Sequence, residues 1–99
     1  MKAKDLLSAL QVDATDSLSN LSTMVYVYAD LGEKPVKQLI LDKSADEIII
    51  KQVAEEPPLT IKELVKALNL YKEANLYLLK DEKQLIYGYR LIKDGIVIG

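Results

Sequence analysis

Apolar residues recur at helical spacing in two stretches of the chain that lie 58 positions apart. In each stretch they occupy positions i, i+3, i+4 and i+7: Ala3, Leu6, Leu7 and Leu10 in the first, and Ile61, Leu64, Val65 and Leu68 in the second. Charged residues lie on the opposite side, so the pattern predicts two amphipathic helices. Thr60 and Glu63 have the spacing of a capping box, which predicts that the second helix begins there.

Short segments rich in Val, Ile, Leu and Tyr follow each helical stretch, and this composition is typical of β-strands. Three segments follow the first helix and three follow the second: Met24 to Ala29, Val36 to Leu41, Glu47 to Val53, Asn75 to Lys80, Gln84 to Ile92 and Gly95 to Ile98. The connections within each half are too short to contain crossover helices. Because parallel neighbours need such crossovers, we expect the strands to pair antiparallel.

The two halves of the chain also resemble each other residue by residue. The helical stretches read MKAKDLLSALQ and LTIKELVKALN, and the strand VYVYAD returns as LYLLKD. The offset between the copies falls from 58 to 51 and then to 48, since the second copy is shorter where connections are expected. Loss of residues confined to connections is typical of a duplicated structural unit.

We therefore predict an α+β fold built from a tandem α-β-β-β repeat. Two helices are expected to pack on one face of an antiparallel six-stranded sheet, or of two three-stranded sheets. Residues 1–99 should form a single domain, with repeats 1–54 and 59–99 joined by a Glu-Glu-Pro-Pro linker. A repeat of this length rarely buries enough apolar surface to fold alone, so the copies are expected to share one core.

Cysteine and histidine are both absent from the chain. Without them there is no thiol nucleophile, no imidazole base, and no thiolate or imidazole metal ligand. Adjacent carboxylates flank predicted turns or the linker, where we interpret them as solvated charges: Asp46-Glu47, Glu55-Glu56 and Asp81-Glu82. We predict no catalytic residue, no cofactor and no metal site; an enzyme that uses only carboxylates, Tyr and Lys is the remaining catalytic alternative.

The chain carries 13 basic and 15 acidic residues, which gives a net charge of −2. This balance does not fit the basic surface of a protein that binds duplex DNA. No apolar run approaches the roughly 20 residues that span a bilayer, and the N-terminus lacks the apolar stretch of a signal peptide. We expect a soluble cytoplasmic protein that does not act at a membrane.

Tyrosine is the only aromatic residue of the chain, which has six Tyr and no Phe or Trp. In the first strand, alternation directs Val25, Val27 and Ala29 toward the helices and the tyrosines away from them. By correspondence Leu76 and Leu78 face inward in the second half, and the two tyrosines of the fifth strand join the outer face if that strand is oriented alike. The side chains expected on the outer face form the candidate interface: Met24, Tyr26, Tyr28, Tyr77, Leu79, Tyr87 and Tyr89.

Three interpretations of these tyrosines stay open. They can lie at the edge of the core with their hydroxyls in water, or they can form an interface, either for a protein partner or for self-association as a homodimer. They can also stack the bases of a single-stranded nucleic acid, with basic residues around them: Lys37, Lys51, Lys80 and Arg90. We favour a small non-enzymatic protein-binding or self-associating module, with a nucleic-acid-associated protein as the alternative.

One further pattern concerns the segments Lys62 to Leu68 and Asp94 to Gly99. The first reads K-[DE]-L-[LV]-x-A-L in both copies, and the second reads D-G-x-V-x-G. Together with the V-Y-V-Y type strand, they resemble short uncharacterised proteins of bacteriophages and prophages of Gram-positive bacteria. The resemblance implies a small accessory protein of a mobile element that modulates a host protein, and it brings no catalytic residues.

Overall fold

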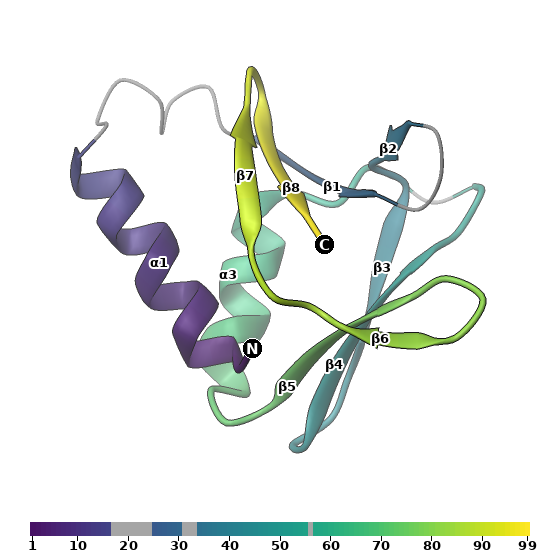
Figure 1. Ribbon diagram of the computed structural model, residues 1–99, viewed down its shortest axis with the longest axis horizontal. Helices are drawn as coiled ribbons and strands as arrows, with labels where there is room; N and C mark the ends of the chain where they lie inside the picture. The colour runs from purple at the N-terminus through teal and green to yellow at the C-terminus, as the bar shows by residue number, and fades with distance from the viewer. Residues whose placement is uncertain (17–24, 31–33, 56) are drawn as a thin grey trace.

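The computed structural model describes residues 1–16, 25–30, 34–55 and 57–99 of the chain. Within these residues, each half of the chain has one helix followed by four strands (Figure 1). The bounds in chain order are α1 (Ala3–Asp16), β1 (Tyr26–Asp30), β2 (Pro35–Val36), β3 (Leu39–Lys43), β4 (Glu47–Gln52), α3 (Ile61–Leu70), β5 (Asn75–Leu79), β6 (Lys83–Leu85), β7 (Tyr89–Ile92) and β8 (Gly95–Ile98). Each half thus contains one strand more than the sequence predicts.

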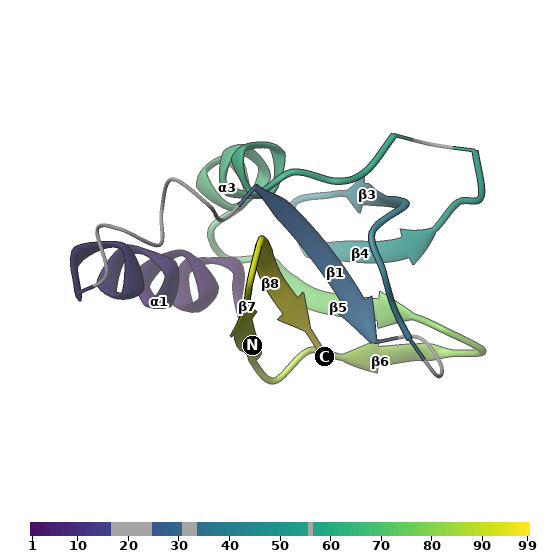
Figure 2. The ribbon, with the colours of Figure 1, turned by 90° about the horizontal axis from the view of Figure 1, so that it is seen from above.

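The described strands form two four-stranded mixed sheets. Sheet A has the strand order β3-β4-β5-β6, and sheet B has the order β2-β1-β8-β7 (Figure 1, Figure 2). The two central strands of each sheet run parallel, β4 with β5 and β1 with β8, whereas the outer pairs are antiparallel. The predicted α+β class is confirmed, but the single antiparallel six-stranded sheet and its three-stranded alternative are wrong.

The parallel pairs explain why the antiparallel prediction fails. Each sheet contains one hairpin from each half, so the two central strands of a sheet belong to different halves. Between β4 and β5 the chain runs through α3, which supplies the crossover connection that parallel neighbours need. The prediction considered only connections within a half, where no crossover exists.

The middle predicted strand of each half divides between the two sheets. Residues of Val36 to Leu41 belong to β2 in sheet B and to β3 in sheet A, and residues of Gln84 to Ile92 belong to β6 in sheet A and to β7 in sheet B. In the second of these segments, Ile86 to Gly88 join the two parts. Apolar alternation continues through this connection, so the pattern alone cannot reveal that the chain changes sheet.

Backbone hydrogen bonds join the start of each helix to the first strand of the other half in an equivalent way. The four bonds run from Val27 N to Leu59 O, Ile61 N to Val25 O, Leu76 N to Met1 O and Ala3 N to Ala74 O, at 2.8 to 2.9 Å. By these hydrogen bonds, equivalent residues at the two helix starts are 58 positions apart, and equivalent residues of β1 and β5 are 49 positions apart. The sequence comparison aligned these two strands with an offset of 51. Tyr28 rather than Tyr26 therefore corresponds to Tyr77. A shift of two residues leaves every side chain on its face, so alternation does not detect it.

The apolar stripes of both helices pack into one core with the inward side chains of the strands. The helices contribute Ala3, Leu6, Leu7, Leu10, Leu64, Ala67 and Leu68, and the central strands contribute Val27, Ala29, Ile48, Ile50, Leu76, Leu78, Ile96 and Ile98. The Thr60 hydroxyl oxygen accepts a hydrogen bond from the backbone N of Glu63 at 3.2 Å. This bond confirms the predicted start of the second helix.

Candidate interaction surface

The structure divides the predicted interface between the outer faces of two sheets. Tyr26 and Tyr28 lie on the outer face of sheet B, and Tyr77 and Leu79 lie on the outer face of sheet A. All four alternate with buried residues, as the sequence predicts. Met24 lies outside the described residues. The predicted interface residues therefore do not lie on one surface, because β1 and β5 belong to different sheets; their role as an interface stays a prediction.

The two tyrosines of the predicted fifth strand are not on an outer sheet face. Tyr87 lies in the connection between β6 and β7, where its side chain is 78% exposed. Tyr89 pairs with Ile98 on the inner face of sheet B and packs against the core. Val25, expected to face the helices, precedes β1 and is exposed. The change of sheet after Leu85 reverses the faces that alternation assigns to Tyr89.

The outer face of sheet B is polar and its groups are partnered. The Tyr28 hydroxyl donates a hydrogen bond to the Asp94 carboxylate at 2.9 Å. The Lys37 ammonium lies 4.4 Å from the centroid of the Tyr26 ring, and Arg90 Nη1 lies 4.0 Å from the Asp30 carboxylate. These contacts pair the polar groups of this face with one another. The outer face of sheet B therefore presents charged and hydroxyl groups beside its tyrosine rings.

Tyr28→Phe tests the hydrogen bond on this face. Burial has the largest effect in raising the pKa of the Tyr28 phenol. The hydrogen bond to Asp94 and the negative charge of that carboxylate raise this pKa further. Because the pKa is higher in the folded state, the neutral phenol stabilises the fold below its ordinary pKa of about 10, and this contribution is lost as the pH rises through the raised pKa. We expect the wild type to melt above the variant at pH 8, with a difference that shrinks above about pH 10. A constant difference in thermal melts across this range would contradict the bond.

The outer face of sheet A carries an apolar surface. The register places Ile49 beside Tyr77 and Tyr77 opposite Leu85, which gives an apolar row across three strands. Leu79 lies one step further along β5 and is 37% exposed, while the buried side chains of β4 and β5 point to the core on the other side. We call this surface the open face of sheet A; it consists of Ile40, Ile49, Tyr77, Leu79 and Leu85.

Charged residues of both signs surround the open face and pair with one another. Lys83 Nζ lies 2.8 Å from a carboxylate oxygen of Glu47, and Lys51 Nζ lies 3.7 Å from one of Asp42. The Lys83 ammonium also lies 4.6 Å from the centroid of the Tyr77 ring. The hydrogen bond to Glu47 raises the pKa of Lys83. The rim thus has charges of both signs, arranged as two ion pairs on the strands of sheet A.

Three residues of the open face were missing from the predicted interface: Ile40, Ile49 and Leu85. The signal for Ile49 was present in the sequence, because Ile48-Ile49-Ile50 is a continuous apolar run. Such a run is typical of a strand that contacts apolar partners on both faces. Ile40 and Leu85 lie in segments that change sheet, and their face could not be assigned from alternation.

No group of three or more acidic side chains is placed to hold a metal ion within the described ranges. Neither of the two helices that the structure describes has the length and apolar character needed to cross a bilayer. No protein-family model, curated protein or solved structure matches the chain.

Proposed function

We propose that this chain is a small non-enzymatic binding module that self-associates as a homodimer through the open face of sheet A. The observation that carries the proposal is the apolar row formed by Ile49, Tyr77 and Leu85, on the face of sheet A opposite the buried side chains of β4 and β5. Exposed apolar surfaces rimmed by polar residues are typical of protein interfaces, and Tyr is enriched in them.

A second copy of the chain is the partner that fits the charges of the rim. Lys83 and Lys51 stand with Glu47 and Asp42 around the apolar row. In a twofold symmetric dimer each patch meets the same patch of the other copy, so a patch with both signs can complement itself. A partner of one strong charge would instead favour a rim of the opposite sign.

The two halves support a proposal on origin. Equivalent hydrogen bonds at the helix starts, together with the matching segments Lys4 to Leu10 and Lys62 to Leu68, are the result expected of a tandem duplication. We infer that an α-β-β-β-β unit was duplicated and that the copies exchanged hairpins between their sheets. We also propose, from the resemblance to phage and prophage proteins, that the module serves a mobile element in the cytoplasm and modulates a host protein.

Nucleic acid is the less favoured partner. The four basic residues considered for it are divided between the sheets: Lys37 and Arg90 belong to the outer face of sheet B, and Lys51 and Lys80 lie in or beside sheet A. Arg90 and Lys51 are also ion-paired. A groove that follows a single strand needs its cations and stacking rings on one surface.

Tyr77→Glu tests self-association. A charge in the apolar row would be buried without a partner in the dimer, so the variant should be monomeric under conditions in which the wild type is dimeric. Sedimentation equilibrium from about 1 µM to 1 mM measures this difference, because weak homodimers dissociate within that range.

Tyr87→Glu is the matched control, since Tyr87 is 78% exposed and lies outside the open face. This variant should dimerise like the wild type, and both variants should keep the wild-type far-ultraviolet circular dichroism. A wild type that stays monomeric at the highest concentration, or a Tyr77→Glu variant that still dimerises, would contradict the proposal.

A further inference from the structure

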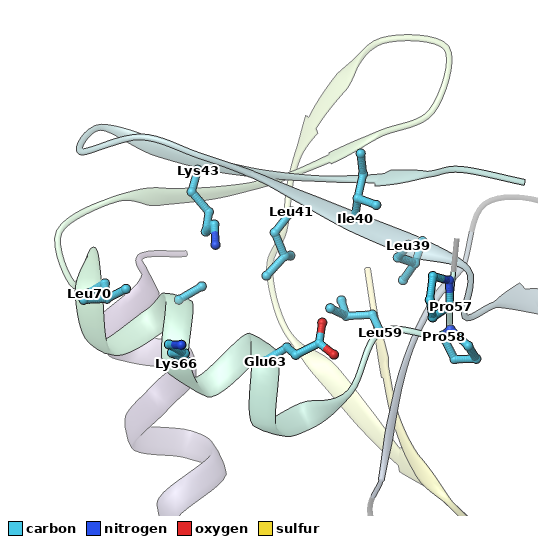
Figure 3. Close-up of a pocket in the computed structure, with 11 residues that line it drawn as sticks. Leu39, Ile40, Leu41, Lys43, Pro57, Pro58, Leu59, Glu63, Lys66 and Leu70 are labelled. Carbon is cyan, nitrogen blue, oxygen red and sulfur yellow. The ribbon is translucent and has the colours of Figure 1, made fainter. Parts of the chain in front are cut away.

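A hollow of about 390 Å³ lies between α3 and β3 at the edge of sheet A (Figure 3). Leu39 and Leu41 line it from the strand, and Pro57 and Pro58 lie near Leu39 at one end. Ala67 and Leu70 line it from the helix. The hollow is therefore a groove between a helix and the last strand of a sheet, lined by apolar and charged side chains.

Two backbone hydrogen bonds fix which groups of β3 point toward β4. Val53 N donates to Gln38 O at 3.0 Å, and Ser44 N donates to Glu47 O at 2.9 Å, at the two ends of the β3–β4 ladder. Hydrogen-bonded pairs alternate along an antiparallel ladder. The even-numbered residues from 38 to 44 consequently direct their N–H and C=O groups to β4.

The odd-numbered residues of β3 direct their backbone groups to the opposite side, which is the free edge of sheet A. Leu41 and Lys43 each present one N–H and one C=O there, and no strand in the described part of the chain pairs with this side of β3. The side chains of the same residues line the groove. An unpaired edge beside a groove that can take alternate side chains is an arrangement that binds extended peptides by strand addition.

The charges of the groove favour an acidic peptide. Lys43 from β3 and Lys66 from α3 lie at the same end as Leu70 (Figure 3). Within the described ranges neither ammonium lies within 4.0 Å of a carboxylate, in contrast to the lysines around the open face. Glu63 is the acidic residue that lines the groove, and Figure 3 shows its carboxylate away from the two lysines.

The equivalent place in the other half of the molecule has a different character. β7 holds the edge position in sheet B that β3 holds in sheet A, and Tyr89 pairs with Ile98 as Leu41 pairs with Ile50. A tyrosine ring thus takes the place of a leucine beside the core. The residues equivalent to Lys43 and Lys66 in this half are Leu91 and Ser8. The cationic groove is a property of one half alone.

We propose that the groove between α3 and β3 binds an extended, acidic segment of a partner protein. The segment pairs with the backbone of Leu41 and Lys43, places an apolar side chain against Leu41 and Ala67, and directs a carboxylate to Lys43 and Lys66. This site shares Ile40 with the open face of sheet A, but it otherwise uses the edge of the sheet and the helix behind it.

Selection from a random dodecapeptide library displayed on phage provides the probe. Selected sequences should share alternating apolar residues followed by Asp or Glu, and the best one is synthesised for nuclear magnetic resonance with the ¹⁵N-labelled full chain. In the free protein the Ile40 and Asp42 amides should exchange slowly with solvent and the Leu41 and Lys43 amides quickly. Addition of the peptide should slow the Leu41 and Lys43 amides.

Two variants at position 43 separate backbone pairing from side-chain contact. Lys43→Ala and Lys43→Pro both remove the ammonium, but only the proline removes the N–H at the free edge, where proline is tolerated. We expect the peptide to bind Lys43→Pro about tenfold more weakly than Lys43→Ala. Lys66→Glu should bind the peptide more weakly than the wild type does, and its binding should depend less on the salt concentration. Tyr77→Glu should bind like the wild type, which keeps this test independent of dimerisation.

Three results would overturn the proposal. The first is a selection that yields no common sequence or a basic one. The second is equal binding by Lys43→Pro and Lys43→Ala. The third is that the Leu41 and Lys43 amides already exchange slowly without peptide, and exchange more slowly still as the protein concentration rises. A second copy of the chain would then occupy the edge.

Discussion

Replacing Gly95 with Ala should destabilise the protein by about 3 kcal/mol or more, which is at the upper end for a single methyl group. Gly95 begins β8 and pairs with Tyr26 of β1 in the parallel centre of sheet B. A Cβ atom at this position would overlap the carbonyl oxygen of Tyr26. The backbone cannot move away without breaking the pairing of β1 with β8, which joins the two halves of the chain in this sheet. Urea unfolding followed by circular dichroism measures the loss.

Gly88→Ala is the matched control for that substitution. Gly88 lies in the connection between β6 and β7, where an added Cβ meets no atom within 4 Å. Its φ is not positive, so alanine fits the backbone. The free energy of unfolding should change by less than about 0.5 kcal/mol, or rise slightly because alanine restricts the unfolded chain. A Gly95→Ala variant as stable as Gly88→Ala would contradict the close approach of β1 and β8.

Leu6→Ala and Leu64→Ala should each cost about 2 to 5 kcal/mol, the range for a leucine truncated in a close-packed core. Both side chains have no exposed surface, and they stand at equivalent positions of α1 and α3. Because the helices pack into one core, each loss should lower the stability of the whole chain in a single transition. Thermal and urea unfolding, followed at several wavelengths, test both the magnitude and the cooperativity.

Leu70→Ala provides the control, since Leu70 on the same helix is 64% exposed. This truncation should cost less than about 1 kcal/mol, because little apolar surface returns to water. Two separate transitions in Leu6→Ala, one for each half, would show that the halves fold independently and would contradict the shared core.

Helix positions and most strand positions follow from local pattern. The stripes around Leu6 and Leu64, the cap at Thr60 and the alternation around Val27 and Leu76 depend on neighbours within a few residues, and the structure confirms each. These features need no knowledge of the rest of the chain, because burial of one face of a helix or strand sets its apolar period.

The pairing of strands between the halves is not a local property. The run from Gln84 to Ile92 alternates as one strand would, yet Leu85 pairs with Tyr77 in sheet A and Tyr89 with Ile98 in sheet B. The sequence places Gly95 at the start of a strand but does not reveal that this glycine is needed for the approach of Tyr26. Contacts between residues far apart in the chain decide both features.

The candidate surface was predictable only in part for the same reason. Tyr77 and Leu79 were placed on an outer face correctly, since their strand stays in one sheet. Tyr26 and Tyr28 also face outward, but on the other sheet. The members contributed by β3 and β6 depend on a change of sheet that alternation does not record.

Self-association through the open face of sheet A is tested most directly by the contacts between two copies. In an equal mixture of ¹³C,¹⁵N-labelled and unlabelled chains, isotope-filtered nuclear Overhauser spectra report only contacts between molecules. The spectra should show contacts of the Tyr77 ring with methyl groups of Ile49, Leu79 or Leu85 of the other copy. Contacts that arise only from α1 or β7, or no intermolecular contacts at millimolar concentration, would contradict the account.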